Sequence, residues 1–389
     1  MTASLISGVD KKTRNRIYFS LYAAVFSAMI GVGIVIPLLP RYAVTMGATG
    51  IWIGTIFSSF ALARIIFLPV FGRISDNVGR KRLILIGLSS YAILSVFYLL
   101  AGTVYELTAL RFFHGMASAL IIPIAIAYIN DIAPQGEEGK FIGSFVSSIY
   151  LGMSFGPFLG GVINDLFSMN AVFLAMAFFS LIALLTSLYY LPDIAIKRVK
   201  TSSFRDVIFH TALRGPILYQ LMYALANGTF MVFLPLVAIQ DPDISSSQTG
   251  LIILMSVIST PVFQHFFSRI SDKFRQYHLI GAGVLLIGIA LLMVPLSGGI
   301  EYYLLSALLL GIGRAISLPA LYTLVYRAGK DIGQGSASGM VNMSLAVGLI
   351  IAPLLSGAVM DCSGISMVFY LSATVTLFCT CIFFHFGKK

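Results

Sequence analysis

The chain has 389 residues, of which 58% are hydrophobic and only 10% are charged. Soluble globular proteins carry about a quarter of their residues charged, so this composition excludes that class and predicts an all-α membrane protein. The net charge of +10 would suggest a nucleic-acid partner in a soluble domain. Basic loops set the orientation of membrane proteins, however, so we expect the lipid bilayer as partner and no nucleic acid.

Long apolar runs predict twelve transmembrane helices, because each run can cross the ~30 Å hydrocarbon core of a bilayer as a helix. In the first half these runs lie near residues 17–40, 50–71, 82–102, 106–129, 139–162 and 170–191. In the second half they lie near 215–239, 246–268, 276–296, 301–326, 337–360 and 366–386. We therefore expect a six-helix bundle over 1–191, a cytoplasmic linker over 192–214 and a second six-helix bundle over 215–389.

The two halves form an internal repeat. The tetrapeptide Arg-Ile-Ser-Asp at residues 73–76 returns at residues 269–272, again between two apolar runs. At the same offset Gly54 matches Gly250, Pro157 matches Pro353 and Asp165 matches Asp361. Glycine and proline fix backbone shape, so the repeat predicts two pseudo-symmetric halves that share a fold.

The first copy of the tetrapeptide belongs to a charged segment, Gly72–Arg82, which we predict to be a tight turn between antiparallel spans. In this turn Gly79 gives the backbone conformational freedom, and the Asp76 carboxylate can cap a helix end or pair with a basic residue. The charge of the predicted loops indicates the orientation, since Lys and Arg all fall on the side of the N-terminus except Arg41. Cytoplasmic loops are the basic ones, so both termini are expected in the cytoplasm.

Four stretches in the expected spans resemble known transporter motifs. Gly72–Arg82 resembles the loop between the second and third helices of the major facilitator superfamily, and Leu110–Gly115 looks like its fourth-helix motif. Gly152–Gly161 looks like the fifth-helix motif of its antiporters, and Gly31–Pro40 is similar to the first-helix pattern of its twelve-helix drug:proton antiporter branch. The resemblance implies a transporter, not an enzyme, that works by alternating access.

The resemblance also assigns a conformational latch. In the superfamily, the loop aspartate and the basic residues after it form a charge cluster with an acid at the end of the fourth helix. Arg73, Asp76 and Arg80 match the loop positions, and Asp131 lies where the fourth helix should end. The alternative is a loop that is held in the cytoplasm by its charge alone.

The fifth helix is expected to form a gating contact. Its small residues share one helical face and allow close helix packing, while a proline permits a bend. These residues are Gly152, Gly156, Pro157, Gly160 and Gly161. Helix packing without a gating role would use the same residues.

The charges inside the spans are cationic. None of the fifteen Asp and Glu residues lies deep in a span, whereas Arg64, Arg111 and Arg314 do. Charges in a membrane mark functional sites by default, so we predict that these arginines accept an anionic or zwitterionic substrate. Alternatively, Arg64 snorkels toward the cytoplasm and Arg111 ties helices together. Neutral contacts are assigned to Asn227, Tyr322 and Asn342.

His114 is the candidate for proton coupling, because imidazole exchanges protons near neutral pH. A hydrogen bond between helices is the alternative role. Antiporters of cationic drugs commonly carry an acidic residue in the membrane part of the N-terminal half, and the first helix here has none.

The sequence thus predicts a monomeric transporter in the inner membrane that exports a small organic molecule in exchange for protons. No cofactor and no metal are expected, and the proton gradient is the expected driving force. An importer or facilitated carrier of organic anions, such as a carboxylate metabolite or siderophore, is the alternative, and a lipid flippase comes after it.

Overall fold

The structure is a computed structural model that describes residues 11–133, 136–192, 211–271, 273–296 and 298–386. Helices are the only regular elements among these residues. Twelve helical segments in this part are long and apolar enough to span a membrane. Each corresponds to one of the twelve predicted spans, which confirms the all-α membrane fold.

Contacts between Cα atoms divide the chain into two compact units. The first unit consists of Met1–Leu38 and Ser59–Lys200, and the second of Leu39–Ser58 and Thr201–Lys389. The predicted bundles differ from these units in one segment, since residues 39–58 pack with the second unit. Residues 193–210 of the predicted linker lie outside the described residues, so the linker stays a prediction.

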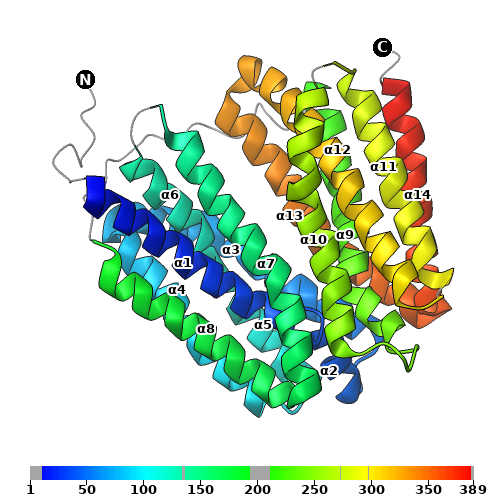
Figure 1. The fold of residues 1–389 in the computed structure, drawn as a ribbon, viewed down its shortest axis with the longest axis horizontal. Helices are drawn as coiled ribbons and strands as arrows, with labels where there is room; N and C mark the ends of the chain where they lie inside the picture. The colour runs from blue at the N-terminus through cyan, green and yellow to red at the C-terminus, as the bar shows by residue number, and fades with distance from the viewer. Residues whose placement is uncertain (1–10, 134–135, 193–210, 272, 297, 387–389) are drawn as a thin grey trace. The chain divides into compact units, whose positions relative to one another are not determined.

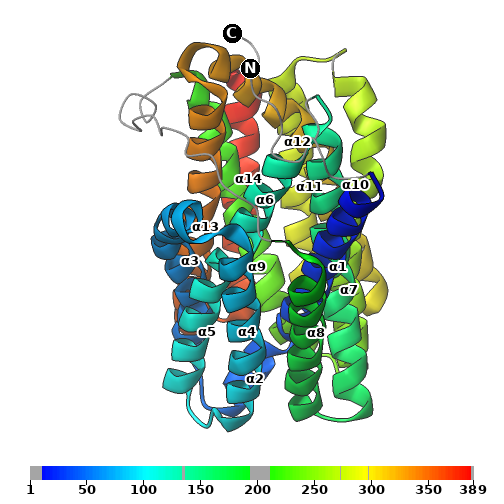
Figure 2. The same ribbon diagram turned by 90° about the vertical axis from the view of Figure 1, so that its left-hand side faces the viewer.

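The first unit contains the helices of the first half of the chain except α2 (Leu39–Thr45) and the start of α3 (Figure 1). They are α1 (Lys11–Val35), the part of α3 (Gly50–Val78) from Ser59 onward, α4 (Arg80–Phe97), η1 (Tyr98–Leu100), α5 (Val104–Ala119), α6 (Ile122–Ile132), α7 (Glu138–Leu166) and α8 (Met169–Tyr190). Helix α1 packs against α7 and α8, and α4 packs against α8, beside which it stands in Figure 2. Large buried rings such as Tyr18, Tyr128 and Phe145 fill the core between these helices.

The second unit contains α2, the start of α3 and the helices of the second half of the chain. They are α2 (Leu39–Thr45), η2 (Thr211–Leu213), α9 (Arg214–Ala238), α10 (Ser246–Ser271), α11 (Gln276–Met293), η3 (Val294–Leu296), α12 (Ile300–Ile332), α13 (Gln334–Ser363) and α14 (Ile365–Phe386). In this unit α12 packs on α10 and α11, while α9 packs on α13 and α14.

The turn predicted at Gly72–Arg82 is far shorter than expected. Helix α3 continues through the tetrapeptide to Val78, and α4 begins at Arg80. Only Gly79 stands between the two helices, with φ of 106°, a backbone conformation that favours glycine. The prediction of a loop over the whole segment was wrong, because helices of transporters can extend past the apolar run that crosses the bilayer.

The two halves also differ at one repeated proline. Pro123 lies in the first turn of α6, after a break at Leu120–Ile121 that separates α6 from α5. Its counterpart Pro319 lies inside α12, which continues without interruption from Ile300 to Ile332. Proline costs no helical hydrogen bond in the first turn of α6, whereas inside α12 it removes one donor that the helix tolerates.

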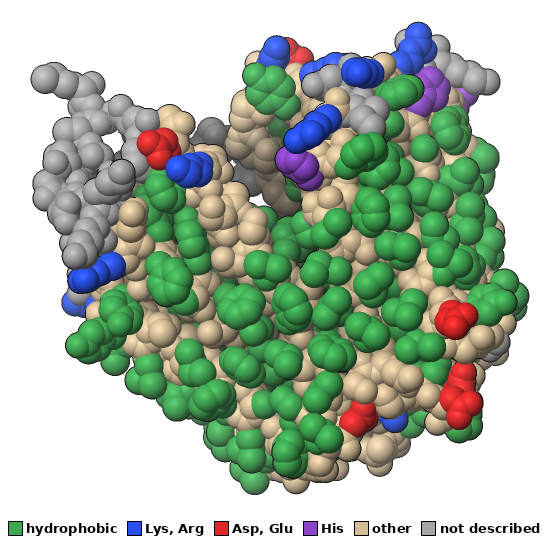
Figure 3. All heavy atoms as spheres, in the orientation of Figure 1, with side chains coloured by type: hydrophobic (Ala, Val, Ile, Leu, Met, Phe, Trp, Pro, Cys, Tyr) green, Lys and Arg blue, Asp and Glu red, His purple; other side chains and the backbone are tan. Residues whose placement is uncertain are grey.

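Side chains on the surface fit a membrane environment. In Figure 3, hydrophobic side chains cover the broad middle of the face that is shown, and Lys and Arg gather near its upper edge. Many large apolar side chains are exposed, including Leu100, Phe178 and Phe378. Exposed apolar surface of this extent is unfavourable in water and favourable against lipid.

Candidate functional site

His114 occupies an aromatic cage in the first unit. It lies on α5 and is fully buried. The rings of Tyr91, Tyr98 and Phe60 surround the imidazole edge-to-face, at centroid distances of 4.3, 6.1 and 5.8 Å. The Tyr98 hydroxyl lies 3.4 Å from Nδ1 of His114, whereas Nε2 has no hydrogen-bond partner among the described residues. One imidazole nitrogen therefore keeps an unused site for a proton.

Arg111 lies one turn before His114 on the same face of α5. Its side chain is buried, and its guanidinium carbon lies 4.6 Å from the centroid of the Phe60 ring. Arg111 also reaches the hydroxyl of Tyr98. A guanidinium over an aromatic face gains a cation–π interaction, so the ring stabilises a cation that has been removed from water.

The beginning of α5 is fixed by a capping box, which sets which side chains face the cage. The Glu106 N–H donates to the Thr103 hydroxyl at 3.3 Å, and the Thr103 N–H donates to the Glu106 carboxylate at 3.1 Å. Next to His114, Gly115 packs directly on the backbone of Phe60. A Cβ added to Gly115 would lie 2.8 Å from the Cα of Phe60. The glycine of the fourth-helix motif thus lets α5 approach α3 closely.

Arg64 lies one turn beyond Phe60 on α3 and is partly buried. Both Arg64 and Arg111 are near enough to Tyr91 to act on its hydroxyl electrostatically. The structure therefore brings three of the predicted site residues, Arg64, Arg111 and His114, together around Tyr91. Phe60, Tyr91 and Tyr98 were not predicted as site residues, because nothing in their spacing distinguishes them from other core aromatics.

A second arginine site lies in the second unit. The guanidinium carbon of Arg314, on α12, lies 4.3 Å from the centroid of the Tyr223 ring on α9. Tyr219 stacks on Tyr223 at 6.1 Å with an interplanar angle of 11°. The Tyr223 hydroxyl donates to the side-chain carbonyl of Asn227 at 3.1 Å. Tyr219, Tyr223 and Asn227 are four residues apart, so this stripe on α9 was detectable from the sequence.

The other two residues predicted to contact the substrate, Tyr322 and Asn342, belong to helices of the same unit. Tyr322 is exposed on α12 and is near enough to Tyr219 to interact with its hydroxyl electrostatically. Asn342 is exposed on α13, and within the described residues it makes no hydrogen bond. The structure thus gathers Arg314, Asn227 and Tyr322 around two stacked tyrosines, without Asn342.

Arg80 is the centre of the predicted latch. Its guanidinium pairs with Asp131, at the end of α6, through a very short contact, and with Asp76 at 3.5 Å. Arg80 is 11% exposed, Asp131 25% and Asp76 52%. Arg73 is exposed, and its side chain forms no ion pair in the described part of the chain. Three of the four predicted latch residues are therefore in contact.

The small residues predicted to form the gating face lie on α7 and contact α1. A Cβ on Gly156 would lie 2.7 Å from the Cα of Gly33, and one on Gly152 would lie 2.7 Å from the Phe26 carbonyl oxygen. Gly160 packs directly on the backbone of Ile34. Pro157 lies inside α7, and Gly161 is buried on it. The close helix contact exists; its gating role stays a prediction.

A further helix contact, which the sequence analysis did not predict, lies in the second unit. The carboxylate of Asp361 on α13 accepts hydrogen bonds from the backbone N–H groups of Gly50 and Ile51, the first residues of α3. Gly357 packs directly on the Gly50 backbone. The Ser58 hydroxyl donates to the Ile350 carbonyl at 2.6 Å, so α3 and α13 remain in contact for two turns.

Comparisons with known proteins agree with this architecture. The model of the Major Facilitator Superfamily matches residues 21–221 and 216–388. An uncharacterized MFS-type transporter of Methanocaldococcus jannaschii is 29% identical over 92% of this chain and 95% of its own length. The quinolone resistance protein NorA of Staphylococcus aureus is 25% identical over 89% of this chain and 90% of its own length. The crystal structure of the nucleoside transporter NupG has a TM-score of 0.82 at 18% identity, over 95% of this chain and 99% of that one.

Proposed function

The chain belongs to the Major Facilitator Superfamily and is a multi-pass membrane transporter, and we propose that it exports a small organic molecule in exchange for protons. The relative that is named for quinolone resistance supports export. Rocking of two bundles around a central substrate is the mechanism that this proposal requires. The proposed location is the inner membrane, with both termini in the cytoplasm and the monomer as the working unit.

The observation that carries proton exchange is the cage around His114. The unpartnered Nε2 of this buried side chain is where a proton can be added. Arg111, one turn away, repels the resulting cation. Protonation of His114 therefore favours a different arrangement of the charged side chains on α5, and this difference biases the alternating-access equilibrium that exchange requires.

The substrate is proposed to be anionic or zwitterionic and to contain an aromatic ring. Arg111 and Arg314 each lie over an aromatic ring, and no Asp or Glu of the chain lies deep in a span to bind a cation. Tyr219 and Tyr223 are buried, whereas Tyr322 is exposed beside them and offers an aromatic surface to a ring of the substrate. A carboxylate on that ring could be held by the guanidinium of Arg314.

Thermal unfolding of the purified protein with matched ligands tests the substrate class, because a ligand that binds the folded state raises its melting temperature. Naphthoate, naphthalenemethanol and naphthylmethylammonium share a ring system and differ in charge, and a quinolone extends the series. We expect stabilisation by the anion and the quinolone that Arg314→Ala abolishes. Stabilisation by the ammonium compound alone would overturn the proposed charge of the substrate.

Transport in proteoliposomes tests the exchange. With a stabilising compound trapped on one side, an imposed pH gradient should drive its uptake against its concentration gradient, and a pH-sensitive dye should report proton movement in the opposite direction. Flux that ignores the pH gradient would instead favour a facilitated carrier of organic anions.

A further inference from the structure

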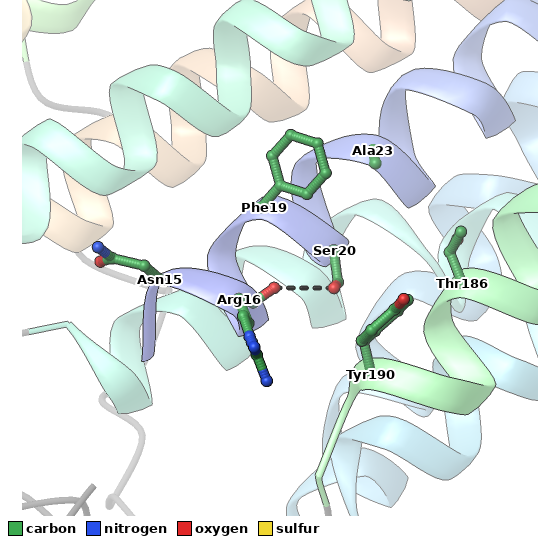
Figure 4. A pocket seen from close by; sticks show the side chains of 7 residues that line it. All are labelled: Asn15, Arg16, Phe19, Ser20, Ala23, Thr186 and Tyr190. Atoms are coloured by element: carbon green, nitrogen blue, oxygen red, sulfur yellow. Dashed lines mark hydrogen bonds between the residues drawn. The ribbon is translucent and has the colours of Figure 1, made fainter. Parts of the chain in front are cut away.

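A groove opens in the first unit where the beginning of α1 meets the end of α8 (Figure 4). Its volume is about 640 Å³. The side chains that matter for its chemistry are Asn15, Arg16, Phe19 and Ser20 from α1, and Thr186 and Tyr190 from α8. None of the described residues that line the groove is acidic, and Arg16 brings a positive charge to it.

We place the groove where the bilayer changes from hydrocarbon to headgroups. Within the described residues the first candidate span runs from Asn15 and the sixth ends at Tyr190, so both walls of the groove lie near span ends. Its polar residues Asn15 and Arg16 come first, and apolar residues Phe19 and Ala23 follow one and two turns deeper along α1. This order matches a lipid, whose charged headgroup lies outside its acyl chains.

The side chains are suited to bind a phosphate ester. Arg16 is exposed and makes no ion pair within the described residues, so its planar guanidinium can donate two parallel hydrogen bonds. The Ser20 hydroxyl donates its proton to the Arg16 carbonyl at 2.8 Å (Figure 4), so the phosphate contact rests on the Arg16 guanidinium. The Phe19 ring is 74% exposed and offers apolar contact to an acyl chain.

We propose that this groove binds an anionic phospholipid, with the headgroup phosphate on Arg16, the glycerol region beside Thr186 and Tyr190, and one acyl chain along Phe19. Bound lipid would bridge α1 and α8. The proposal depends on the chain being embedded in a bilayer and is independent of the transported substrate.

Lipid titration of the purified, delipidated full-length protein tests the site. Phosphatidylglycerol should raise the melting temperature in a saturable manner, and phosphatidylcholine with the same acyl chains should not. Arg16→Gln should weaken the apparent affinity for phosphatidylglycerol about five- to tenfold, since one basic residue near a membrane contributes about that much to anion binding. Thr186→Phe, which fills the groove and keeps Arg16, should abolish the saturable response.

Arg214→Gln is the matched control, because Arg214 is an exposed arginine at the first residue of α9, the repeat counterpart of α1, and does not line the groove. It should leave the phosphatidylglycerol response unchanged. Three results would overturn the proposal: an equal response to both lipids, an unchanged response in Arg16→Gln and Thr186→Phe, or inorganic phosphate reproducing the effect of the lipid.

Discussion

The carboxylate of Asp361 accepts the backbone N–H of Ile51 at 2.8 Å and also that of Gly50, although 310 positions separate Asp361 from Ile51. The first N–H groups of a helix have no partner inside the helix, and its N-terminus carries a partial positive charge. One aspartate therefore satisfies both requirements at the start of α3. The neighbouring glycines let α13 come close enough for these bonds to form.

Removing the charge of this aspartate should loosen the start of α3. Asp361→Asn keeps one acceptor oxygen and loses the attraction to the helix N-terminus, so we expect a loss of about 0.5–2 kcal/mol in unfolding free energy. The measurement is the melting temperature in nanodiscs. Asp243→Asn, at an exposed aspartate between α9 and α10, should leave it unchanged, and an equal effect of both variants would contradict a specific cap.

Asp131 should matter more for stability than Asp76. Asp131→Asn leaves the largely buried Arg80 without its principal partner, which should cost about 2–4 kcal/mol. Asp76 is half exposed and lies four residues from Arg80, so Asp76→Asn should cost only about 0.3–0.5 kcal/mol. Chemical denaturation of both variants compares the two values, and the reverse order would show that Asp76 is the main partner.

The latch makes a separate kinetic prediction for Asp76. Asp76→Asn should slow transport turnover more than it weakens substrate binding, because a latch biases a conformational equilibrium and does not touch the substrate. Initial transport rates and ligand affinities measured on the same preparation separate the two effects. Unchanged turnover would leave Asp76 as a surface charge that only orients the segment.

The same substitution should have opposite effects at two glycines of α7. Gly156→Ala places a methyl group against Gly33, which should cost about 1–3 kcal/mol through overpacking. Gly143→Ala meets no atom within 4 Å and should gain about 0.5–1 kcal/mol from helix propensity. Melting temperatures of the two variants test this contrast, which equal destabilisation would contradict.

His114 should carry the response to the proton gradient. His114→Gln keeps a polar side chain of similar length in the cage but cannot be protonated, so uptake driven by a pH gradient should fall at least about tenfold. Exchange of substrate down its own gradient should persist. His265→Gln, at an exposed histidine of α10, is the control, and gradient-driven uptake retained in His114→Gln would place coupling elsewhere.

The positions of the spans were predictable, whereas the meeting of distant residues was only partly so. Apolar runs of full length have one stable solution in a bilayer, so each predicted span has a helix in the structure. The pair Arg80 and Asp131 was predictable through the motif resemblance. The rings around His114 were not, because single-sequence spacing fixes a helical face and not the helix that this face meets.

The helix ends were the least predictable feature. Hydropathy follows the bilayer and not the helix, so α3 was expected to end near residue 71 and instead continues to Val78. The same limit applies to the contact between Asp361 and α3. The repeat identified Asp361 as a position that fixes the fold, but the distance along the chain to Gly50 gave no sign that the two would meet.

The division of α3 between the two units has a consequence for biosynthesis. Residues 50–58 leave the ribosome long before α13, which supplies their packing partners. Ile51 precedes Asp361 by 310 residues, which at about 5–20 residues per second corresponds to about 15–60 s. During this interval the start of α3 lies in the membrane without its cap. The first six spans therefore complete their packing only after the eleventh span has been inserted.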